Sequence, residues 1–423
     1  MKIHPMFKTL INFKGNARGC VYTEALNGIP NSLLAPYVSV YMLALGINDE
    51  QIGLWLSVGW VFQLIMAVFG GVITDKLGRR KTTLIFDIFA WTIPAIIFAF
   101  AQTYWHFLAA AVMASFLRVA ANAWTCLMVE DAEADELIDI FTWIQIMCLT
   151  SAYFVPLAGL LIMKFDLIPA VRMMYLFAAL SFTVKAFLTY RLTTETTQGL
   201  VRMEQTRGKS LFSSLKEYDG VFKIIFNNPA SLITMGIMAI MSISTTINGT
   251  FWSVIVTEKI GIPAEHIAIY PFAKSIVMLL FFFLVIPRMK TVNFKIPMMV
   301  GFSGFLFSQL ILVLVPQANY GVLLISILFE ACSLATVTPL LEQMTIVTID
   351  AKERARIQSI LYVAVILITS PFGWIAGLLS AQEKALPFVL NMILLSIGVF
   401  LAYLAGKVAE KQLFNANDGQ IAC

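Results

Sequence analysis

Long apolar runs govern what this chain can fold into. Runs of about 20 or more apolar residues recur along it, and a helix of that length crosses the hydrocarbon core of a bilayer. Twelve such runs lie at residues 19–45, 52–74, 82–101, 105–129, 139–163, 169–191, 229–257, 265–287, 296–316, 319–347, 356–379 and 386–406. The sequence therefore predicts an all-α membrane protein with twelve transmembrane helices.

Composition argues against soluble and nucleic-acid-binding proteins. Hydrophobic residues make up 59% of the 423 residues and charged residues only 13%, which is too little charge to cover a soluble protein of this size. The net charge of +4 comes from bases in short loops between apolar runs, so we expect no nucleic-acid partner. The five cysteines show neither paired nor metal-ligand spacing; we expect no metal site and interpret them as small apolar side chains.

Lysine and arginine indicate the sides of the membrane. With a cytoplasmic N-terminus, 22 of the 29 Lys and Arg residues fall in cytoplasmic segments and four fall in external loops. This excess follows the positive-inside bias and predicts that both termini are cytoplasmic. The first run lacks a small-residue cleavage site, so we expect it to be retained. The predicted location is the plasma membrane, here a bacterial cell membrane.

The longest polar interval divides the chain into two halves of six runs each. It predicts an N-terminal six-helix bundle at 1–191, a cytoplasmic linker at 192–228 and a C-terminal six-helix bundle at 229–423. Short fragments recur between the halves at a nearly constant offset, such as 158–161 and 376–379, which indicates a duplicated unit. Apolar residues at helical spacing predict an amphipathic helix within the linker: Leu211, Leu215, Tyr218, Phe222 and Ile225.

One loop combines glycine with charge. Residues 71–81, between the second and third runs, read Gly-Val-Ile-Thr-Asp-Lys-Leu-Gly-Arg-Arg-Lys and predict a tight turn at the membrane surface. Gly71 would allow close helix packing, and Gly78 a turn conformation closed to residues with a side chain. Asp75 is the only acid among four bases, so we expect it to have a salt-bridge or helix-end partner.

This loop resembles the signature loop between the second and third helices of the major facilitator superfamily, whose pattern is roughly G-x-x-x-D-[RK]-x-G-[RK]-[RK]. No essential position of that pattern is missing here. The resemblance implies two pseudo-symmetric six-helix bundles that rock about a central site in alternating access. It also implies that a set of loop residues forms the conformational gate: Gly71, Asp75, Gly78, Arg79 and Arg80. The alternative is an ordinary basic turn.

Charged residues inside apolar runs are costly and usually have a function or a partner. Arg118 lies near the middle of the fourth run and begins a polar stripe with Asn122. Its candidate partners are Glu24 in the first run and Glu330 in the tenth. The alternatives are purely structural ion pairs and, for Glu24, an interfacial carboxylate that faces Arg18.

The resemblance adds that helices one, four, seven and ten line a central cavity. It therefore places Glu24, Arg118 and Glu330 there and implies that they couple transport to protons. Relatives with an acid in helix one and an arginine in helix four include proton-driven drug exporters and proton-driven sugar importers. The pair therefore implies coupling and leaves the direction open.

Three further charged residues lie in apolar runs. Lys274 in the eighth run either recognises an anionic substrate or pairs with Glu330, and the sequence favours neither. Lys185 and Asp87 lie nearer the cytoplasmic ends of their runs, and we interpret them as snorkelling or structural residues.

Polar residues inside the runs are candidates for substrate binding. Two asparagines continue the stripe that starts at Glu24, and the seventh run is unusually polar. Such side chains hydrogen-bond either a ligand or neighbouring helices, and both roles stay open. The candidate substrate-binding residues are Asn27, Asn31, Asn122, Gln145, Asn248, Trp252 and Lys274.

The loop at 130–136, after the fourth run, is acidic, whereas its repeat partner at 350–356 is basic on balance. We hypothesise that these loops and the signature loop form ion pairs between the halves that close the cytoplasmic side. Solvated surface charge is the alternative.

Together these features predict a secondary transporter of a small molecule, coupled to protons and functional as a monomer. Export by antiport is favoured because the fifth run keeps Pro156 and Gly159 of the superfamily's antiporter pattern, although the leading glycine is absent. The alternatives are a proton-coupled importer of a sugar or organic acid, and a transporter-like sensor or lipid-handling protein. The sequence has no P-loop and no convincing catalytic constellation, so we expect no enzyme activity and no cofactor.

Overall fold

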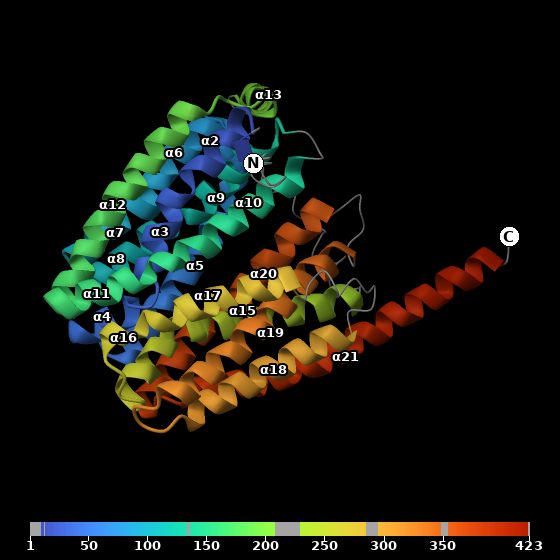
Figure 1. Ribbon diagram of the computed structural model, residues 1–423. Helices are drawn as coiled ribbons and strands as arrows, with labels where there is room; N and C mark the ends of the chain where they lie inside the picture. The colour runs from blue at the N-terminus through green and yellow to red at the C-terminus, as the bar shows by residue number, and fades with distance from the viewer. Residues whose placement is uncertain are drawn as a thin grey trace, which may run out of the picture. The chain divides into compact units, whose positions relative to one another are not determined.

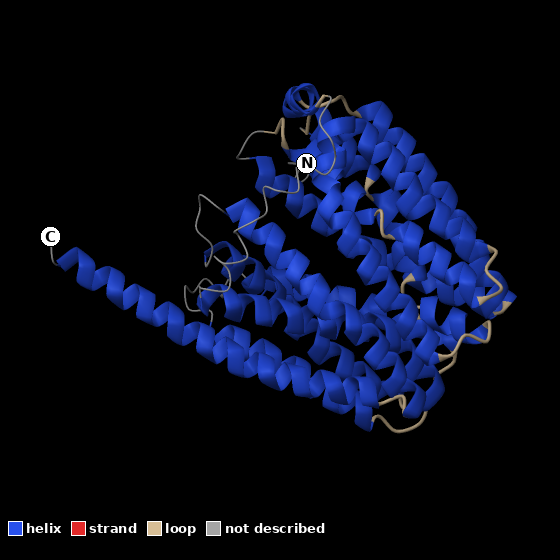
Figure 2. Ribbon diagram, turned by 180° about the vertical axis from the view of Figure 1, so that it is seen from behind, coloured by secondary structure: helices blue, strands red, loops and turns tan. Residues whose placement is uncertain are grey.

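The computed structural model describes residues 10–11, 13–132, 136–207, 229–284, 295–347 and 354–421. In that part of the chain every regular element is a helix (Figures 1 and 2). The predicted all-α class is therefore confirmed. The helices form two compact units: unit 1 comprises Met1–Glu217 with Ala264–Phe272, and unit 2 comprises Tyr218–Pro263 with Ala273–Cys423. The predicted bundle boundaries stay predictions.

Unit 1 holds the helices of the first six predicted spans and one helix of the linker. The bounds are α2 (Gly15–Thr23), α3 (Ala25–Leu34), α4 (Val38–Ala44), α5 (Asp49–Leu77), α6 (Arg79–Asp87), the π-helical η1 (Ile88–Thr92), α7 (Ile93–Ala99), α8 (Tyr104–Ala114), α9 (Leu117–Val129), α10 (Glu136–Ser151), the 3-10 turn η2 (Ala152–Phe154), α11 (Val155–Phe165), α12 (Leu167–Leu192) and α13 (Thr197–Thr206). The predicted amphipathic helix around 211–225 lies outside the described residues.

Unit 2 holds the later spans. Its elements are α15 (Pro229–Val254), the π-helical η4 (Ile255–Lys259), α17 (Ile269–Leu284), α18 (Lys295–Leu314), α19 (Tyr320–Val347), α20 (Arg354–Gln382) and α21 (Leu386–Ile421). The short α16 (Ala264–Ile267) and the first residues of α17 belong to unit 1.

Within the described residues, eleven helical stretches are long and apolar enough to cross a membrane, and they correspond to the second to twelfth predicted spans. The first predicted span consists of three shorter helices instead. α3 ends at Leu34, two residues before Pro36, which has no N–H to continue the helical hydrogen bonds. Pro30 inside α3 has no N–H for the carbonyl of Leu26, and the Ser181 hydroxyl of α12 donates to that carbonyl at 2.7 Å.

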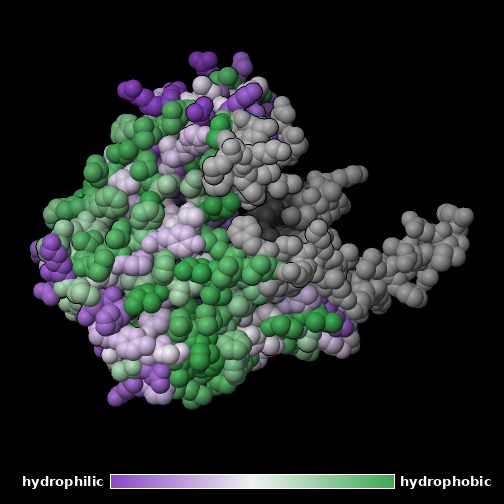
Figure 3. Space-filling view, viewed as in Figure 1, coloured by the Kyte–Doolittle hydropathy of each residue, from purple (hydrophilic) through white to green (hydrophobic). Residues whose placement is uncertain are grey.

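The surface of unit 1 has the polarity of a membrane protein. Figure 3 shows hydrophobic residues over the middle of its helices, with hydrophilic residues gathered near α13 and near the opposite ends of the helices. Its interior near α2, α9 and α10 is an apolar cluster of buried side chains: Phe13, Ala17, Cys20, Val21, Leu127, Met128, Ile140 and Trp143.

Candidate functional site

The turn of the signature loop consists of a single residue. α5 continues to Leu77 and α6 begins at Arg79, so Gly78 alone connects them. Its φ of +83° lies in the left-handed region that glycine favours, as the sequence predicted. A Cβ at Gly78 would also meet the Glu195 carboxylate and the sulfur of Met203, at 2.5 and 2.9 Å. Alanine would therefore strain the backbone here and displace the Glu195 carboxylate.

The expected close helix contact lies one residue away from its predicted position. A Cβ at Gly71 would meet nothing within 4 Å, whereas one at Gly70 would approach the backbone of Arg118 at 3.5 Å. The prediction for Gly71 is therefore corrected: α5 packs closely on α9 through Gly70. A shift of one residue turns a helical position by about 100°, which explains the difference.

Glu195 binds the start of α6. Its carboxylate accepts hydrogen bonds from the backbone N–H groups of Arg79 at 2.7 Å and Arg80 at 3.1 Å, which have no partner within the helix. Arg80 in turn donates to the Tyr190 carbonyl at 2.7 Å, and its guanidinium lies 3.9 Å from the centre of the Tyr190 ring. The end of α12 and the residues after it thus hold the signature loop.

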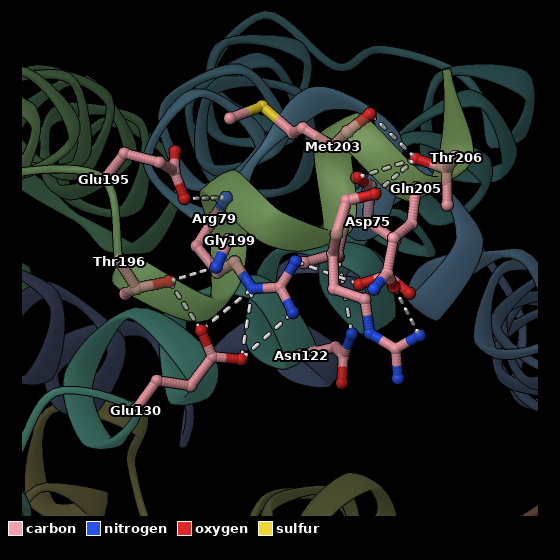
Figure 4. Close-up of polar contacts among 12 residues, drawn as sticks. Asp75, Arg79, Asn122, Glu130, Glu195, Thr196, Gly199, Met203, Gln205 and Thr206 are labelled. Carbon is pink, nitrogen blue, oxygen red and sulfur yellow. Dashed lines mark hydrogen bonds and ion pairs between the residues drawn. The ribbon is translucent and has the colours of Figure 1, made fainter. Parts of the chain in front are cut away.

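Arg79 is the buried centre of this network (Figure 4). Its Nη1 donates to Asp75 Oδ1 at 2.9 Å, one helical turn away. Its Nε and Nη2 donate to the two oxygens of Glu130, each at 3.0 Å, in a bidentate pair. Asp75 therefore has the salt-bridge partner that the sequence predicted. One buried guanidinium links the ends of α5 and α9.

The linker helix α13 joins the same network (Figure 4). The Thr196 hydroxyl contacts Glu130 Oε2 at 2.5 Å and accepts from the Gly199 N–H at 2.9 Å, which caps α13. The Thr206 hydroxyl donates to the Asp75 carbonyl at 3.2 Å. Both ends of α13 are therefore attached to the network around Arg79, one through Glu130 and the other through Asp75.

The first residue of the acidic loop forms an ion pair within its own unit. Glu130 binds Arg79 of unit 1. Glu133, Asp135 and residues 350–353 of the repeat partner lie outside the described residues. Ion pairing between the halves therefore stays a prediction for those residues.

Arg118 follows the break between α8 and α9 and contacts α5. Its Nε donates to Gln63 Oε1 at 3.0 Å, and its guanidinium lies 5.8 Å from the centre of the Trp60 ring. One turn further along α9, Asn122 donates to Thr74 Oγ1 at 3.3 Å. The predicted stripe of Arg118 and Asn122 thus lies against α5.

Glu24 connects α2 to α3 and is only 7% exposed. Its Oε1 lies 3.5 Å from Asn27 Nδ2, and Asn31 Nδ2 donates to Asn27 Oδ1 at 3.3 Å. Asn27 and Asn31 are half-buried. The predicted stripe is thus a chain of hydrogen bonds from a buried carboxyl group toward a more accessible face.

The sequence did not predict a buried ion pair in unit 1. Lys185 of α12 donates to Asp87 of α6 at 2.7 Å, with side chains only 5% and 4% exposed. Of the snorkelling and structural roles that the sequence left open for Lys185 and Asp87, the structure shows the structural one, because the Lys185 ammonium group binds a buried partner. Opposite charges in two apolar runs were the available signal, but the residues are 98 positions apart.

The second buried acid lies in unit 2. Glu330 of α19 pairs with Lys274 of α17 at 2.5 Å, with side-chain exposures of 7% and 30%. Of the two roles that the sequence left open for Lys274, the structure shows the ion pair.

The remaining candidates differ in burial. Asn248 of α15 is 7% exposed, and neither amide atom has a hydrogen-bond partner among the described residues. Trp252 is half-buried, and Gln145 of α10 is exposed within a membrane span. A buried amide without a partner among the described residues can hydrogen-bond a polar ligand or an ordered water. Substrate binding by these residues stays a prediction.

Long apolar helices, buried intramembrane charges and a charged network at one loop define a polytopic membrane transporter. The family model of the Major Facilitator Superfamily matches residues 22–365, and the chain belongs to that superfamily. It is therefore a multi-pass membrane protein that acts on a small-molecule substrate.

Curated relatives match a limited part of the chain. The multidrug resistance protein MdtG of Proteus mirabilis is 34% identical over 88 residues, which is 20% of this chain and 22% of that protein. MdtG of Serratia proteamaculans is 31% identical over 105 residues, 24% of this chain and 25% of that protein. The matched region thus spans about a fifth to a quarter of each relative.

Solved transporter structures share the fold over almost the whole chain. The nucleoside transporter NupG has a TM-score of 0.69 and 15% identity, covering 93% of this chain and 98% of its own. A bacterial homolog of the human lysosomal transporter Spinster, in an inward-facing conformation, has a TM-score of 0.68 and 12% identity, covering 96% and 98%. At these identities the likeness concerns the fold alone.

Proposed function

We propose that this transporter couples export of a small molecule to inward movement of protons, with Glu24, Arg118 and Glu330 as the coupling residues. The observation that carries the proposal is that each unit contains a buried glutamate within a predicted membrane span, with whole-residue exposures of 7% for Glu24 and 5% for Glu330. Burial favours the protonated form of a carboxyl group, and a nearby cation favours the carboxylate. Such a group can take up a proton in one conformation and release it in another.

Polar side chains in the spans support a hydrated substrate path. Asn27 and Asn31 are half-buried, while Asn122 and Gln145 are exposed. Lipid tails offer no hydrogen bonds, so exposed polar groups in a span favour a water-filled cavity. Lys274 adds a partly accessible ammonium group, which could exchange Glu330 for an anionic group of the substrate.

The network around Arg79 supports the gating role of Asp75, Gly78, Arg79 and Arg80, and it does not include Gly71. It joins the ends of α5 and α9 to α13 through one buried guanidinium. Alternating access between two six-helix halves would require these ends to move, and the bidentate pair with Glu130 would favour one arrangement. Both termini would be cytoplasmic, and a single chain would suffice.

Export is the proposed direction because the curated relatives bear the name multidrug resistance protein. Two further features of the proposal, the coupling ion and the substrate, are open to direct measurement.

The test uses purified protein in liposomes that contain a pH-sensitive dye, with equal pH on both sides. Ethidium, a nucleoside, a sugar and an organic acid are added outside in turn, and solute uptake is measured in parallel. Antiport predicts alkalinisation of the lumen as a solute enters, and Glu24→Gln or Glu330→Gln abolishes it. Acidification would identify an importer by symport. Solute uptake without any pH change would refute proton coupling.

A further inference from the structure

Three charged residues from separate parts of unit 1 gather in its interior. Glu24 lies between α2 and α3, Asp87 ends α6, and Lys185 lies in the second half of α12. Their exposures are 7%, 3% and 4%. α12 contacts the chain on both sides of Glu24: the Thr189 hydroxyl lies 2.8 Å from that of Thr23, and the Ser181 hydroxyl donates to the Leu26 carbonyl at 2.7 Å. Lys185 lies one helical turn from both Ser181 and Thr189 on the same face of α12, which places it beside Glu24.

The surroundings of this cluster are apolar or weakly polar. The Lys185 ammonium lies 5.7 Å from the centre of the Trp124 ring of α9. Among the described residues, two further titratable groups lie near the cluster, the thiols of Cys20 on α2 and Cys148 on α10. Electrostatic interactions are therefore strong here, and an unbalanced charge is costly.

The cluster has two acids and one base. Lys185 and Asp87 are joined by a direct hydrogen bond of 2.7 Å, so they balance each other. Glu24 has a longer contact of 3.5 Å with the neutral amide of Asn27. With the pair ionised, a protonated Glu24 makes the cluster neutral and an ionised Glu24 leaves one negative charge.

The two members of the pair act on Glu24 with different strength. Lys185 is on α12, which contacts the chain on both sides of Glu24, whereas Asp87 is on α6, which packs against α12 and α9. The pair is therefore oriented, with its positive end acting more strongly on Glu24. A pair with this orientation lowers the cost of the negative charge that remains when Glu24 loses its proton.

We propose that Lys185, oriented by Asp87, is a positioning residue that sets the pH at which Glu24 binds and releases a proton. The step is a simple equilibrium: a proton from water adds to one carboxylate oxygen of Glu24, and no other bond changes. This proposal rests on the proposed role of Glu24 in coupling and adds two residues to it.

The test measures the proton on Glu24 directly and needs no transported solute. Dicyclohexylcarbodiimide reacts with protonated carboxyl groups in apolar surroundings. Purified protein in detergent micelles is labelled across a pH series, and mass spectrometry of the peptide containing Glu24 gives the midpoint pH of labelling. Glu24→Gln identifies the background.

The decisive variant reverses the pair with Asp87→Lys and Lys185→Asp together. It keeps an ion pair between α6 and α12 but turns its negative end toward Glu24. We expect the labelling midpoint to rise by about one pH unit or more. A purely structural role for the pair predicts no change, so an unchanged midpoint in folded protein would overturn the proposal.

Single substitutions test the direction in which the labelling midpoint shifts. Lys185→Met should raise the midpoint, Asp87→Asn should lower it, and Lys185→Arg should stay close to the wild type. Size-exclusion profiles show which variants are folded. If a single variant does not fold, the double variant with the reversed pair still tests the proposal. Shifts of both single variants in the same direction would also overturn the proposal.

The result also separates this inference from the proposed function. If the midpoint shifts as expected but no solute moves protons, proton-coupled transport fails while the role of Lys185 stands. If Glu24→Gln abolishes proton-coupled transport while the reversed pair leaves the midpoint unchanged, the proposed function stands and the role of Lys185 fails.

Discussion

The two lysine pairs within membrane spans differ in how accessible they are. The side chains of Lys185 and Asp87 are 5% and 4% exposed, whereas those of Lys274 and Glu330 are 30% and 7% exposed. Each pair joins two helices of one unit. The difference suggests that the pair of Lys185 and Asp87, called here the sealed pair, fixes the electrostatic surroundings of its neighbours. The pair of Lys274 and Glu330, called here the open pair, is better suited to break and bind a proton or a solute instead.

The largest effect should come from breaking the sealed pair. Lys185→Met leaves the Asp87 carboxylate buried without its partner and close to another acid, so we expect unfolding free energy to fall by about 3 kcal/mol. Denaturant unfolding in mixed micelles at neutral pH measures it. Lys185→Arg is the matched control because it keeps the charge, and an equal loss in both variants would contradict the account.

A neutral contact on the same helix face should cost less. Ser181 lies four residues before Lys185 on α12, and its hydroxyl binds the carbonyl that Pro30 leaves unpaired. Ser181→Ala should lower the unfolding free energy by about 1 kcal/mol. Ser181→Thr, which keeps the hydroxyl, is the control. A loss as large as that of Lys185→Met would mean that packing, and not charge, dominates this interface.

The open pair should matter less for stability. Lys274→Met removes a partly exposed ammonium group, and Glu330 can then take up a proton, so we expect a loss below about 1 kcal/mol. Transport of the solute that the liposome assay identifies should nevertheless be lost. The same unfolding assay and liposome assay measure both effects. A large loss of stability with normal transport would reverse the roles assigned to the two pairs.

The smallest perturbation tests accessibility itself. Lys274→Cys and Lys185→Cys are each treated with a charged, membrane-impermeant thiol reagent in detergent micelles. We expect rapid modification at position 274 and little at position 185, because only the first side chain is partly exposed. The background of natural cysteines is measured on unchanged protein. Equal rates at both positions would contradict the comparison.

Much of the fold followed from the sequence because hydropathy and local chemistry determine it. Membrane helices need long apolar runs, and only glycine readily adopts the φ found at Gly78. The pairing of Asp75 was also foreseeable, since its partner Arg79 is one turn away. Pro30 and Pro36 could have revealed the interruption of the first span.

The rest depended on contacts between residues that are distant in the chain. Glu195 binds the start of α6 from 116 and 115 positions away, and Lys185 meets Asp87 across 98 positions. Hydropathy assigns residues to spans but does not say which faces of two spans meet. Ion pairs inside the bundle were therefore visible only as unpaired charges in apolar runs.

The most direct test of the central claim separates coupling from solute movement. Wild-type protein and Glu24→Gln are placed in liposomes, and the solute identified above is followed both in exchange against itself and in accumulation driven by a pH gradient. The account predicts that Glu24→Gln keeps exchange, which moves no net protons, and loses accumulation. Accumulation at the wild-type level in Glu24→Gln would contradict the claim that this buried carboxyl group couples transport to protons.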